Sequence, residues 1–469
     1  MNSVPPAAPA LPAASPRSAD LIARSRAVVW HPCTQMKDHE WLPLVPVAKA
    51  EGVWLETPDG HRIIDAVSSW WTNIFGHRHP VIVEHLKRQL DTLDHVLLAG
   101  FTHEPVVSLS EKLVALTPEG LSRCFYADNG SSAVEVALKM SVHYWRNVGR
   151  PEKIRFAALS NGYHGETLGA LGVGDTGLYR DTYKSLLLDP VVLPSPDCSL
   201  MQVGGRGAGE SWEDYSRRRF ADARQILEAH ADTLAAVIVE PLVQCAGGMR
   251  MFHPIWLKML RETCDALGIH LIADEIATGF GRTGQMFACD HANITPDFIC
   301  LSKGITGGTL PLAVTLTNER VYEAFYDDYA TGKAFLHSHS YTGNPLACAA
   351  ALGTLAVFDQ CNWMAVVRGL GQLMWTQTAA LRQHPQVAEV RQQGMILAVE
   401  LAQSPHQRAP YPAADRRGLR AYQHALTRGV LLRPLGNTLY LMPPYVITAA
   451  ELGRVCDVLI EAVDVATRP

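Results

Sequence analysis

The sequence lacks the features that would place the protein in a membrane or on nucleic acid. No apolar run reaches the ~18 residues that a membrane-spanning helix requires, so we expect no such helix. No block of like charges occurs and the formal net charge is −5, so nothing indicates binding to nucleic acid. With 48% hydrophobic and 19% charged residues, the 469-residue chain is typical of a globular protein, and its length favours two packed domains.

Paired cysteines and metal-binding histidine motifs are also missing. The ten cysteines include no CxxC pair, which favours reduced thiols in a cytoplasmic protein over a disulfide scaffold or a structural zinc site. The close histidine pairs, His77 with His79 and His337 with His339, do not form an HExxH motif. We therefore expect no metal ion.

The N-terminus lacks the order of a secretory signal, in which a basic segment precedes an apolar one. Met1–Ser18 is rich in proline and alanine and contains one arginine. Such a composition does not supply a packed core. Residues 1–20 are therefore predicted to form a disordered tail.

The most informative stretch is residues 269–303. It contains two short apolar runs, 269–273 and 298–302, which are typical of buried parallel strands. Asp274 follows the first run and Lys303 follows the second. Open α/β sheets bind ligands at the carboxyl ends of parallel strands. A carboxylate and an amine are therefore expected at one edge of a sheet.

This pair of residues suits the chemistry of pyridoxal phosphate (PLP). A lysine amine attaches the aldehyde of PLP as a Schiff base, and a carboxylate keeps the pyridine nitrogen protonated so that the ring can accept electrons. The alternative is an exposed lysine and a strand-end acid that never meet, since both residue types are mostly exposed.

Strands and helices alternate between about residues 120 and 317, which predicts a mostly parallel sheet with helices on both faces. Gly130 and Ser131 stand between a strand and a helix, where they could bind a phosphate group or belong to a plain helix cap. Tyr163 follows another strand and could cover a ligand ring or lie in a packed turn. Ser340 could add a hydroxyl group to a phosphate site.

Two adjacent tryptophans and one arginine are candidates for substrate binding. Trp70 and Trp71 could wall a ligand and attract a cation, or they could pack in the core or an interface. Arg433 directly follows an apolar strand and could bind a carboxylate with two hydrogen bonds. A structural ion pair is the alternative for Arg433.

One motif points to a different cofactor. Residues 172–177 match GxGxxG, with Asp197 about twenty residues further on. The dinucleotide fingerprint also needs a strand before the glycines and a helix after them. Neither neighbouring segment has that pattern, so a nicotinamide-dependent oxidoreductase is kept only as the competing hypothesis.

Taken together, these stretches resemble the class III aminotransferases, which are PLP enzymes of fold type I. The resemblance rests on the sequence Asp-Glu-Ile-Ala-Thr-Gly-Phe-Gly-Arg-Thr-Gly at 274–284 together with Lys303. It implies an α/β fold with a large PLP-binding domain, residues 76–345, that has a mostly parallel sheet. A smaller α/β domain would be built from both chain ends, residues 21–75 and 346–469.

The resemblance also implies roles for individual residues. Lys303 would hold PLP and move the proton, and Asp274 would pair with the ring nitrogen. Tyr163 would stack on the ring and complete the catalytic set. The phosphate group would be bound by Gly130, Ser131 and Ser340 of the partner subunit, because the family works as a homodimer with shared active sites.

Two further motifs are similar to the branch of the family that acts in biotin biosynthesis: Ser-Ser-Trp-Trp at 68–71 and Met-Pro-Pro-Tyr at 442–445. This similarity implies S-adenosylmethionine as the amino donor and 8-amino-7-oxononanoate as the acceptor. Trp70, Trp71, Arg433 and Ser338 would surround the substrates. Because Cys33 stands where the family commonly has tyrosine, lysine stays open as the donor, and another class III ω-aminotransferase is the alternative.

Overall fold

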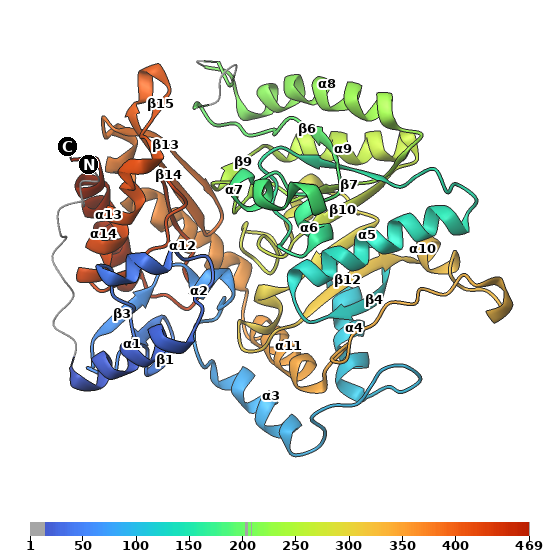
Figure 1. The fold of residues 1–469 in the computed structure, drawn as a ribbon, viewed down its shortest axis with the longest axis horizontal. Coiled ribbons are helices and arrows are strands. Elements are labelled where there is room, and N and C mark those ends of the chain that lie inside the picture. The colour runs from blue at the N-terminus through green and yellow to red at the C-terminus, as the bar shows by residue number, and fades with distance from the viewer. Residues whose placement is uncertain (1–14, 202–204, 208, 469) are drawn as a thin grey trace.

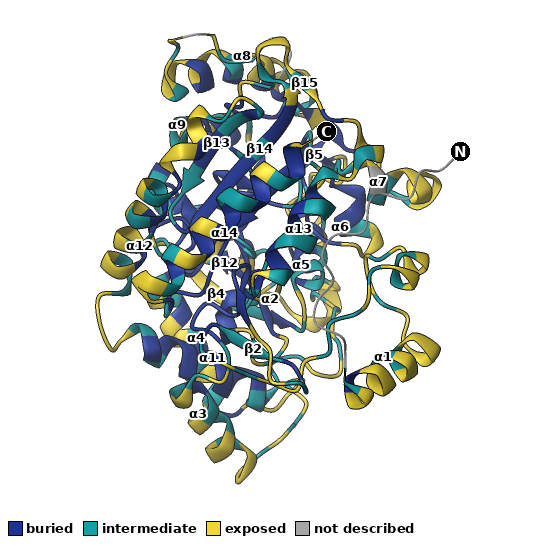
Figure 2. Ribbon diagram, turned by 90° about the vertical axis from the view of Figure 1, so that its left-hand side faces the viewer, coloured by how far each residue is buried: buried dark blue, intermediate teal, exposed yellow. Residues whose placement is uncertain are grey.

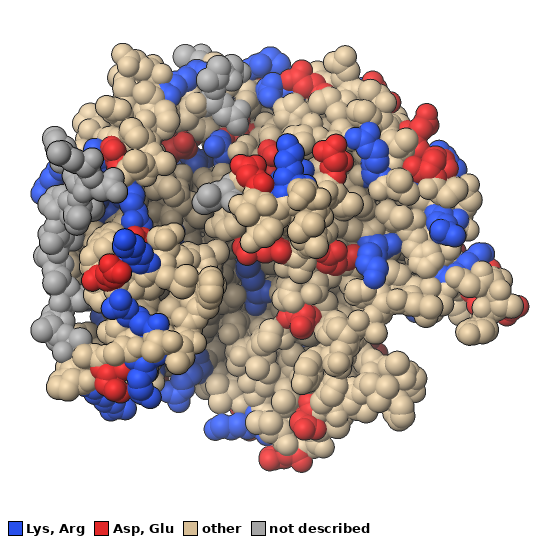
Figure 3. Space-filling view, in the orientation of Figure 1, with Lys and Arg blue, Asp and Glu red and all other residues tan. Residues whose placement is uncertain are grey.

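The computed structural model describes residues 15–201, 205–207 and 209–468. The middle of the chain forms one part of the molecule, and the two chain ends lie side by side in the other (Figure 1). This arrangement agrees with the predicted α/β fold, while the domain boundaries at 75/76 and 345/346 stay a prediction. In the space-filling view the surface is hollowed between the two parts, and both signs of charge are mixed over the face shown (Figure 3).

A seven-stranded sheet lies at the centre of the larger part, in the order β4-β12-β11-β10-β7-β5-β6. The pairs from β11 to β6 are all parallel, and β12 runs antiparallel to both of its neighbours. The predicted mostly parallel sheet is therefore confirmed. Its strands are β4 (Leu121–Ala127), β5 (Arg155–Leu159), β6 (Val191–Leu193), β7 (Leu234–Val239), β10 (His270–Asp274), β11 (Phe298–Leu301) and β12 (Ala313–Asn318).

Helices cover both faces of this sheet, because alternate residues of each strand point to opposite sides. In β7, Ala236 and Ile238 join the buried cluster that contains helix α5, whereas Val237 and Val239 join the cluster that contains α8 and α9. All six residues of β7 are buried, as expected for a parallel strand covered twice. Figure 2 shows the strands as a buried layer inside helices whose outer faces are exposed.

Fourteen α-helices lie within the described residues. They are α1 (Pro16–Val28), α2 (Ser68–Trp71), α3 (Pro80–Leu90), α4 (Glu104–Leu116), α5 (Gly130–Asn147), α6 (Leu168–Gly172), α7 (Gly177–Arg180), α8 (Trp212–His230), α9 (Pro254–Leu267), α10 (Glu319–Glu323), α11 (Pro345–Phe358), α12 (Trp363–Gln377), α13 (Arg417–Thr427) and α14 (Ala449–Thr467).

Strands from the two chain ends pair with each other in the smaller part. β3 belongs to an antiparallel hairpin with β2, and it also pairs in parallel with β16. This pairing fixes an N-terminal strand to a C-terminal one. The strands of the smaller part are β1 (Lys49–Glu51), β2 (Trp54–Glu56), β3 (Arg62–Asp65), β13 (Val387–Gln393), β14 (Ile396–Ser404), β15 (Ala409–Pro410), β16 (Val430–Leu431) and β17 (Thr438–Leu441). A separate hairpin in the middle of the chain is formed by β8 (Val243–Gln244) and β9 (Arg250–Met251).

The predicted disordered tail, residues 1–20, is wrong at its end. Residues 1–14 lie outside the described part of the chain, but Pro16–Asp20 belong to helix α1. The Ser15 hydroxyl accepts a hydrogen bond from the backbone of Ser18 at 3.3 Å, and Pro16 occupies the first turn. A serine cap followed by proline is a local helix signal, and it outweighs the proline- and alanine-rich composition.

Among the described residues, no single helix is long and apolar enough to cross a membrane. One helix pair, α11 and α12, passes that test of length and composition only when the two are taken together, and they are bent by 75°.

The turn at Gly394 ties the smaller part to the loop that follows Asp274. Its φ is +58°, and a Cβ atom there would lie 2.5 Å from the carbonyl oxygen of Arg282 and 2.6 Å from the nitrogen of Gly284. We expect Gly394→Ala to destabilise the protein by about 3 kcal/mol, because backbone atoms cannot move aside as a side chain can. Gly268→Ala is the matched control, since its φ is +61° with open space around the added atom. It should cost only the conformational strain, about 1 kcal/mol. Equal losses of thermal stability in Gly394→Ala and Gly268→Ala would contradict the expected clash.

Candidate active site

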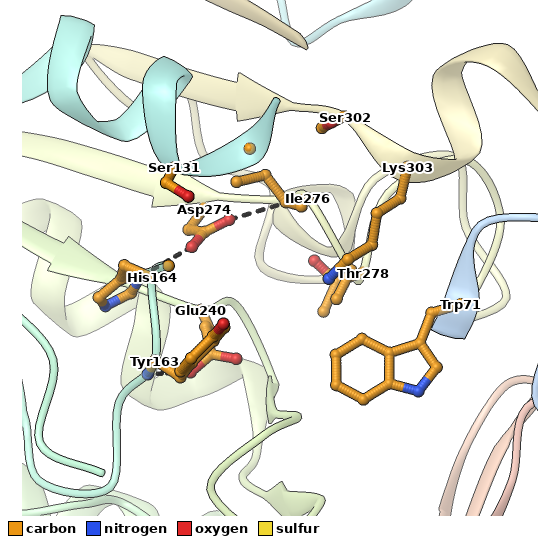
Figure 4. Close-up of a pocket in the computed structure, with 13 residues that line it drawn as sticks. Trp71, Ser131, Tyr163, His164, Glu240, Asp274, Ile276, Thr278, Ser302 and Lys303 are labelled. Carbon is orange, nitrogen blue, oxygen red and sulfur yellow. Dashed lines mark hydrogen bonds and ion pairs between the residues drawn. The ribbon is translucent and has the colours of Figure 1, made fainter. Parts of the chain in front are cut away.

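A pocket opens at the carboxyl ends of the central strands (Figure 4). Asp274 ends β10, Ser302 and Lys303 follow β11, and Glu240 follows β7. Trp71 from the smaller part lies on the opposite side of the pocket from Tyr163 and Glu240. The structure therefore brings the predicted carboxylate and amine together at one edge of the sheet, and the alternative in which they never meet is wrong.

The carboxylate of Asp274 is buried and held by two partners. One oxygen accepts a hydrogen bond from the backbone of Ile276 at 3.1 Å, and the other lies 2.7 Å from Nδ1 of His164. Asp274 is 4% exposed and His164 is 1% exposed. A buried carboxylate needs hydrogen-bond partners in place of water, and these two supply them. The arrangement can hold a positive ring N–H opposite the carboxylate.

The Lys303 amine is placed for nucleophilic chemistry. Burial lowers the pKa of its amine below the ordinary lysine value, so more of the amine is in the neutral, nucleophilic form at neutral pH. Nζ lies 4.4 Å from the centre of the Trp71 ring, and within the described residues it makes no hydrogen bond or ion pair. The Lys303 backbone has a φ of +46°, which is unusual for any residue except glycine.

The N-terminus of α5 forms another wall of the pocket. Asn129 caps the helix by accepting a hydrogen bond from the backbone of Ser132 at 3.0 Å. Gly130 and Ser131 are therefore free of the capping role and line the pocket. Gly165 lies so close that a Cβ atom there would sit 2.6 Å from Oγ of Ser131. The N-terminus of this 18-residue helix can bind an anion.

These residues fit PLP. A buried carboxylate suits the ring nitrogen, an unpaired amine suits the aldehyde carbon, and a long helix offers its N-terminus to the phosphate group. Tyr163 lines the same pocket, as expected for a ring-covering residue. Its hydroxyl donates a hydrogen bond to Glu166 at 3.0 Å, and its ring lies edge-on to Tyr179 with 6.0 Å between centres.

The two tryptophans have different surroundings. Trp71 is buried, and its indole N–H donates a hydrogen bond to the hydroxyl of Tyr440 at 3.0 Å. Trp70 is 40% exposed, and the guanidinium of Arg433 lies 4.2 Å from its ring centre. Trp70 and Arg433 are therefore neighbours, whereas only Trp71 faces the amine of Lys303.

Five residues named from the sequence do not line this pocket: Trp70, Arg433, Ser338, Ser340 and Cys33. Ser338 and Ser340 are exposed and do not line it. Their predicted roles, with Ser340 acting from the partner subunit, stay predictions. Cys33 is exposed, and its sulfur lies 3.9 Å from the hydroxyl of Tyr179. Burial, with Cys33 adding to the effect, raises the pKa of Tyr179 to about 12.

The competing nicotinamide hypothesis is wrong, because the GxGxxG match at 172–177 lacks the strand that this motif requires before it. Gly172 ends the short helix α6 and Gly177 begins the short helix α7. The motif therefore follows a helix, whereas the dinucleotide fingerprint follows a strand.

Two pocket residues were not assigned a role from the sequence. Glu240 follows β7 as Asp274 follows β10, so the strand-end argument could have found it. His164 contacts Asp274 across 110 positions of sequence, and no local pattern indicates that contact. Burial raises the pKa of Glu240 to about 7; the charge of His164 opposes the rise and that of Asp274 adds to it.

The fold and this site define a PLP-dependent enzyme of fold type I. The sequence model of the family described as aminotransferase class-III matches residues 35–463. The chain is 44% identical to the adenosylmethionine-8-amino-7-oxononanoate aminotransferase of Helicobacter pylori, covering 95% of this chain and 98% of that protein. The chain belongs to the class III aminotransferases.

Solved structures agree with the family. The crystal structure of the adenosylmethionine-8-amino-7-oxononanoate aminotransferase from Methanocaldococcus jannaschii matches with a TM-score of 0.89 and 34% identity, over 95% of this chain and 99% of that one. The omega transaminase from Pseudomonas jessenii in complex with PMP matches with a TM-score of 0.89 and 28% identity, over 95% and 98% of the two chains.

The raised pKa of Glu240 predicts a pH dependence. A buried carboxyl group with a raised pKa binds a proton more tightly in the folded state, so its contribution to stability falls as pH rises from about 4.5 to about 7. Glu240→Gln cannot titrate. The thermal stability of the cofactor-free wild type relative to this variant should therefore fall between pH 4.5 and pH 7.5. Glu152→Gln is the control. The exposed carboxyl of Glu152 has a lowered pKa, mainly because Arg150 donates a hydrogen bond to it, so the thermal stability of the wild type relative to this variant should not fall over that pH range. A difference in thermal stability between the wild type and Glu240→Gln that does not change with pH would contradict the raised pKa.

Proposed function

We propose that the protein is a transaminase of biotin biosynthesis that transfers an amino group from S-adenosylmethionine to 8-amino-7-oxononanoate, giving 7,8-diaminononanoate. The observation that carries the chemistry is the Lys303 amine in the same pocket as the buried Asp274 carboxylate. The names of the relatives support the choice of substrates. The Ser-Ser-Trp-Trp motif at 68–71 supports it from this chain's own sequence.

Three residues of the pocket would have tasks in this reaction. PLP, when bound, supplies an electron-accepting ring and an aldehyde that carries the amino group. Asp274 would pair with the ring nitrogen, and His164 holds Asp274 in place. Lys303 would hold the cofactor, and its amine would carry the proton during the transfer. Its lowered pKa helps it to accept that proton and to give it up again.

The two substrates differ in charge, and the neighbouring side chains of Trp70 and Arg433 would offer a surface for each. The guanidinium of Arg433 suits the carboxylate of the oxo acid. Aromatic faces suit the sulfonium cation of the donor. Since Arg433 already covers one face of Trp70, the donor would use the other surfaces of Trp70 and Trp71.

A homodimer with shared active sites belongs to this proposal. The loop that carries Ser338 and Ser340 is exposed in the single chain, and Leu336 and Tyr341 beside it are 92% and 61% exposed. Large apolar side chains at such exposure suit an interface. Ser340 of the partner subunit would then add its hydroxyl to the phosphate site. We also place the reaction in the cytoplasm, which suits ten cysteines that are all free thiols.

The donor can be tested by one half-reaction. The PLP-loaded protein should be yellow, and adding S-adenosylmethionine without acceptor should bleach the colour as the amino group moves to the cofactor. Bleaching by lysine alone would keep the reaction but change the donor. Bleaching only by an ω-amino acid would contradict the proposed function, although the protein would still act as a class III aminotransferase. Lys303→Ala is the control, because it lacks the amine and should not turn over although it stays folded.

The role of Arg433 can be tested by substitution. Arg433→Ala should raise the KM for the oxo acid far more than the KM for the donor, with a loss of about 2 kcal/mol of transition-state binding. Arg428→Ala is the matched control, because Arg428 is an exposed arginine five residues earlier that pairs with Glu461 at 3.2 Å. An unchanged oxo-acid KM in Arg433→Ala would show that Arg433 is structural.

A further inference from the structure

The segment that carries both tryptophans has an unusual backbone. Ser68, Ser69, Trp70 and Trp71 all have positive φ, at +50°, +43°, +71° and +77°. In this region the Cβ atom of an L-residue approaches the following carbonyl oxygen, and such residues normally occur singly. Four in a row form a left-handed turn without a glycine. Such strain persists only where the surroundings hold the turn, and it is typical of functional sites.

A buried carboxylate holds this turn through hydrogen bonds. Asp65, which ends β3, is 0% exposed. One of its oxygens accepts a hydrogen bond from the Ser69 hydroxyl at 2.7 Å and lies 3.0 Å from Nε2 of His77. The other oxygen accepts from the backbone of Val67 at 3.3 Å. Burial alone would raise the pKa of Asp65, but the hydrogen bonds from His77 and Ser69 offset it and leave the pKa below its ordinary value.

The turn is fixed on its other sides by the smaller part of the molecule and by the loop after Asp274. The Ser68 hydroxyl donates to the carbonyl oxygen of Met442 at 2.8 Å, and Arg282 donates to that of Trp71 at 3.4 Å. His77 is itself held by two backbone hydrogen bonds with Gly52, at 2.7 and 3.1 Å. The histidine that the sequence singled out as half of a pair therefore belongs to this support.

The position of the turn decides where two functional contacts lie. It places Trp71 against the amine of Lys303 at 4.4 Å and Trp70 against the guanidinium of Arg433 at 4.2 Å. We propose that Asp65, supported by His77, is a positioning residue, which holds the left-handed turn at 68–71 and thereby sets both tryptophans for substrate binding. Asp65 does not itself touch the pocket; it acts through the turn.

Asp65→Ala tests the proposal, with Asp297→Ala as the matched control. Asp297 is also buried and also accepts hydrogen bonds, from Arg261, Arg320 and the backbone of Leu271, but it lies at the start of β11, away from the turn. Both variants should lose thermal stability. Only Asp65→Ala should raise the KM for both substrates, by about tenfold, with PLP binding retained.

Hydrogen exchange supplies a readout that needs no activity. The amides of Trp71, Thr72 and Asn73 donate to carbonyl oxygens of Val67 and Ser68. Exchange in residues 66–75 should be about tenfold faster in Asp65→Ala and unchanged in Asp297→Ala. Wild-type exchange and wild-type KM values in Asp65→Ala would overturn the proposal, and so would an equal rise of KM in Asp297→Ala. If Asp65→Ala does not fold, Asp65→Asn keeps the shape while its amide group faces the donors of Ser69 and His77.

A rescue separates positioning from general stability. Glycine adopts positive φ without penalty, so adding Ser69→Gly to Asp65→Ala should recover much of the lost affinity. Ser69→Ala in the same background also removes the hydroxyl but cannot relax the backbone, and it should not recover affinity. Equal behaviour of the two double variants would overturn the proposal. The KM measurements rest on the proposed function and would use whichever donor bleaches the wild type. The hydrogen-exchange measurement tests the role of Asp65 even if the proposed substrates prove wrong.

Discussion

A carboxylate and an amine share a site from which most water is excluded, and the rest of the structure serves that arrangement. Asp274 lies at the edge of the sheet, where it is 4% exposed and is held by hydrogen bonds with His164 and the backbone of Ile276. The same burial lowers the pKa of Lys303 and raises that of Glu240. The parallel pairing of β10 with β11, in which Asp274 lies opposite Cys300, sets where these groups meet.

Strained backbone carries several of the groups around this site. Lys303 and the two tryptophans all have positive φ without being glycine. The surrounding structure must offset the free energy that such conformations cost. Arg282, buried at 1% exposure, illustrates this by donating to Pro443 at 2.7 Å and packing on the ring of Tyr445. The two parts of the chain therefore support one pocket together.

The neighbouring elements distinguish two glycine-containing stretches that both suggest a phosphate site. Gly130 follows a strand and opens an 18-residue helix, so its backbone can serve an anion. Gly172 ends a short helix and Gly177 opens another, so the GxGxxG match has no strand to position it. The difference lies in the neighbouring elements and not in the motif. The proline-rich N-terminal segment shows the same rule, because the cap at Ser15 starts a helix that overall composition does not predict.

The sequence by itself determined the alternating strands and helices of the central sheet, the strand-end positions of Asp274 and Lys303, and the presence of a helix next to Gly130 and Ser131. These features follow from apolar runs and caps, which are local properties of the chain. Only the tertiary structure decided that His164 meets Asp274, that Cys33 meets Tyr179, and that Asp65 and His77 hold the tryptophan turn. Those contacts depend on the order of strands in the sheet and on the pairing of the chain ends, and the pattern around any one residue does not specify either.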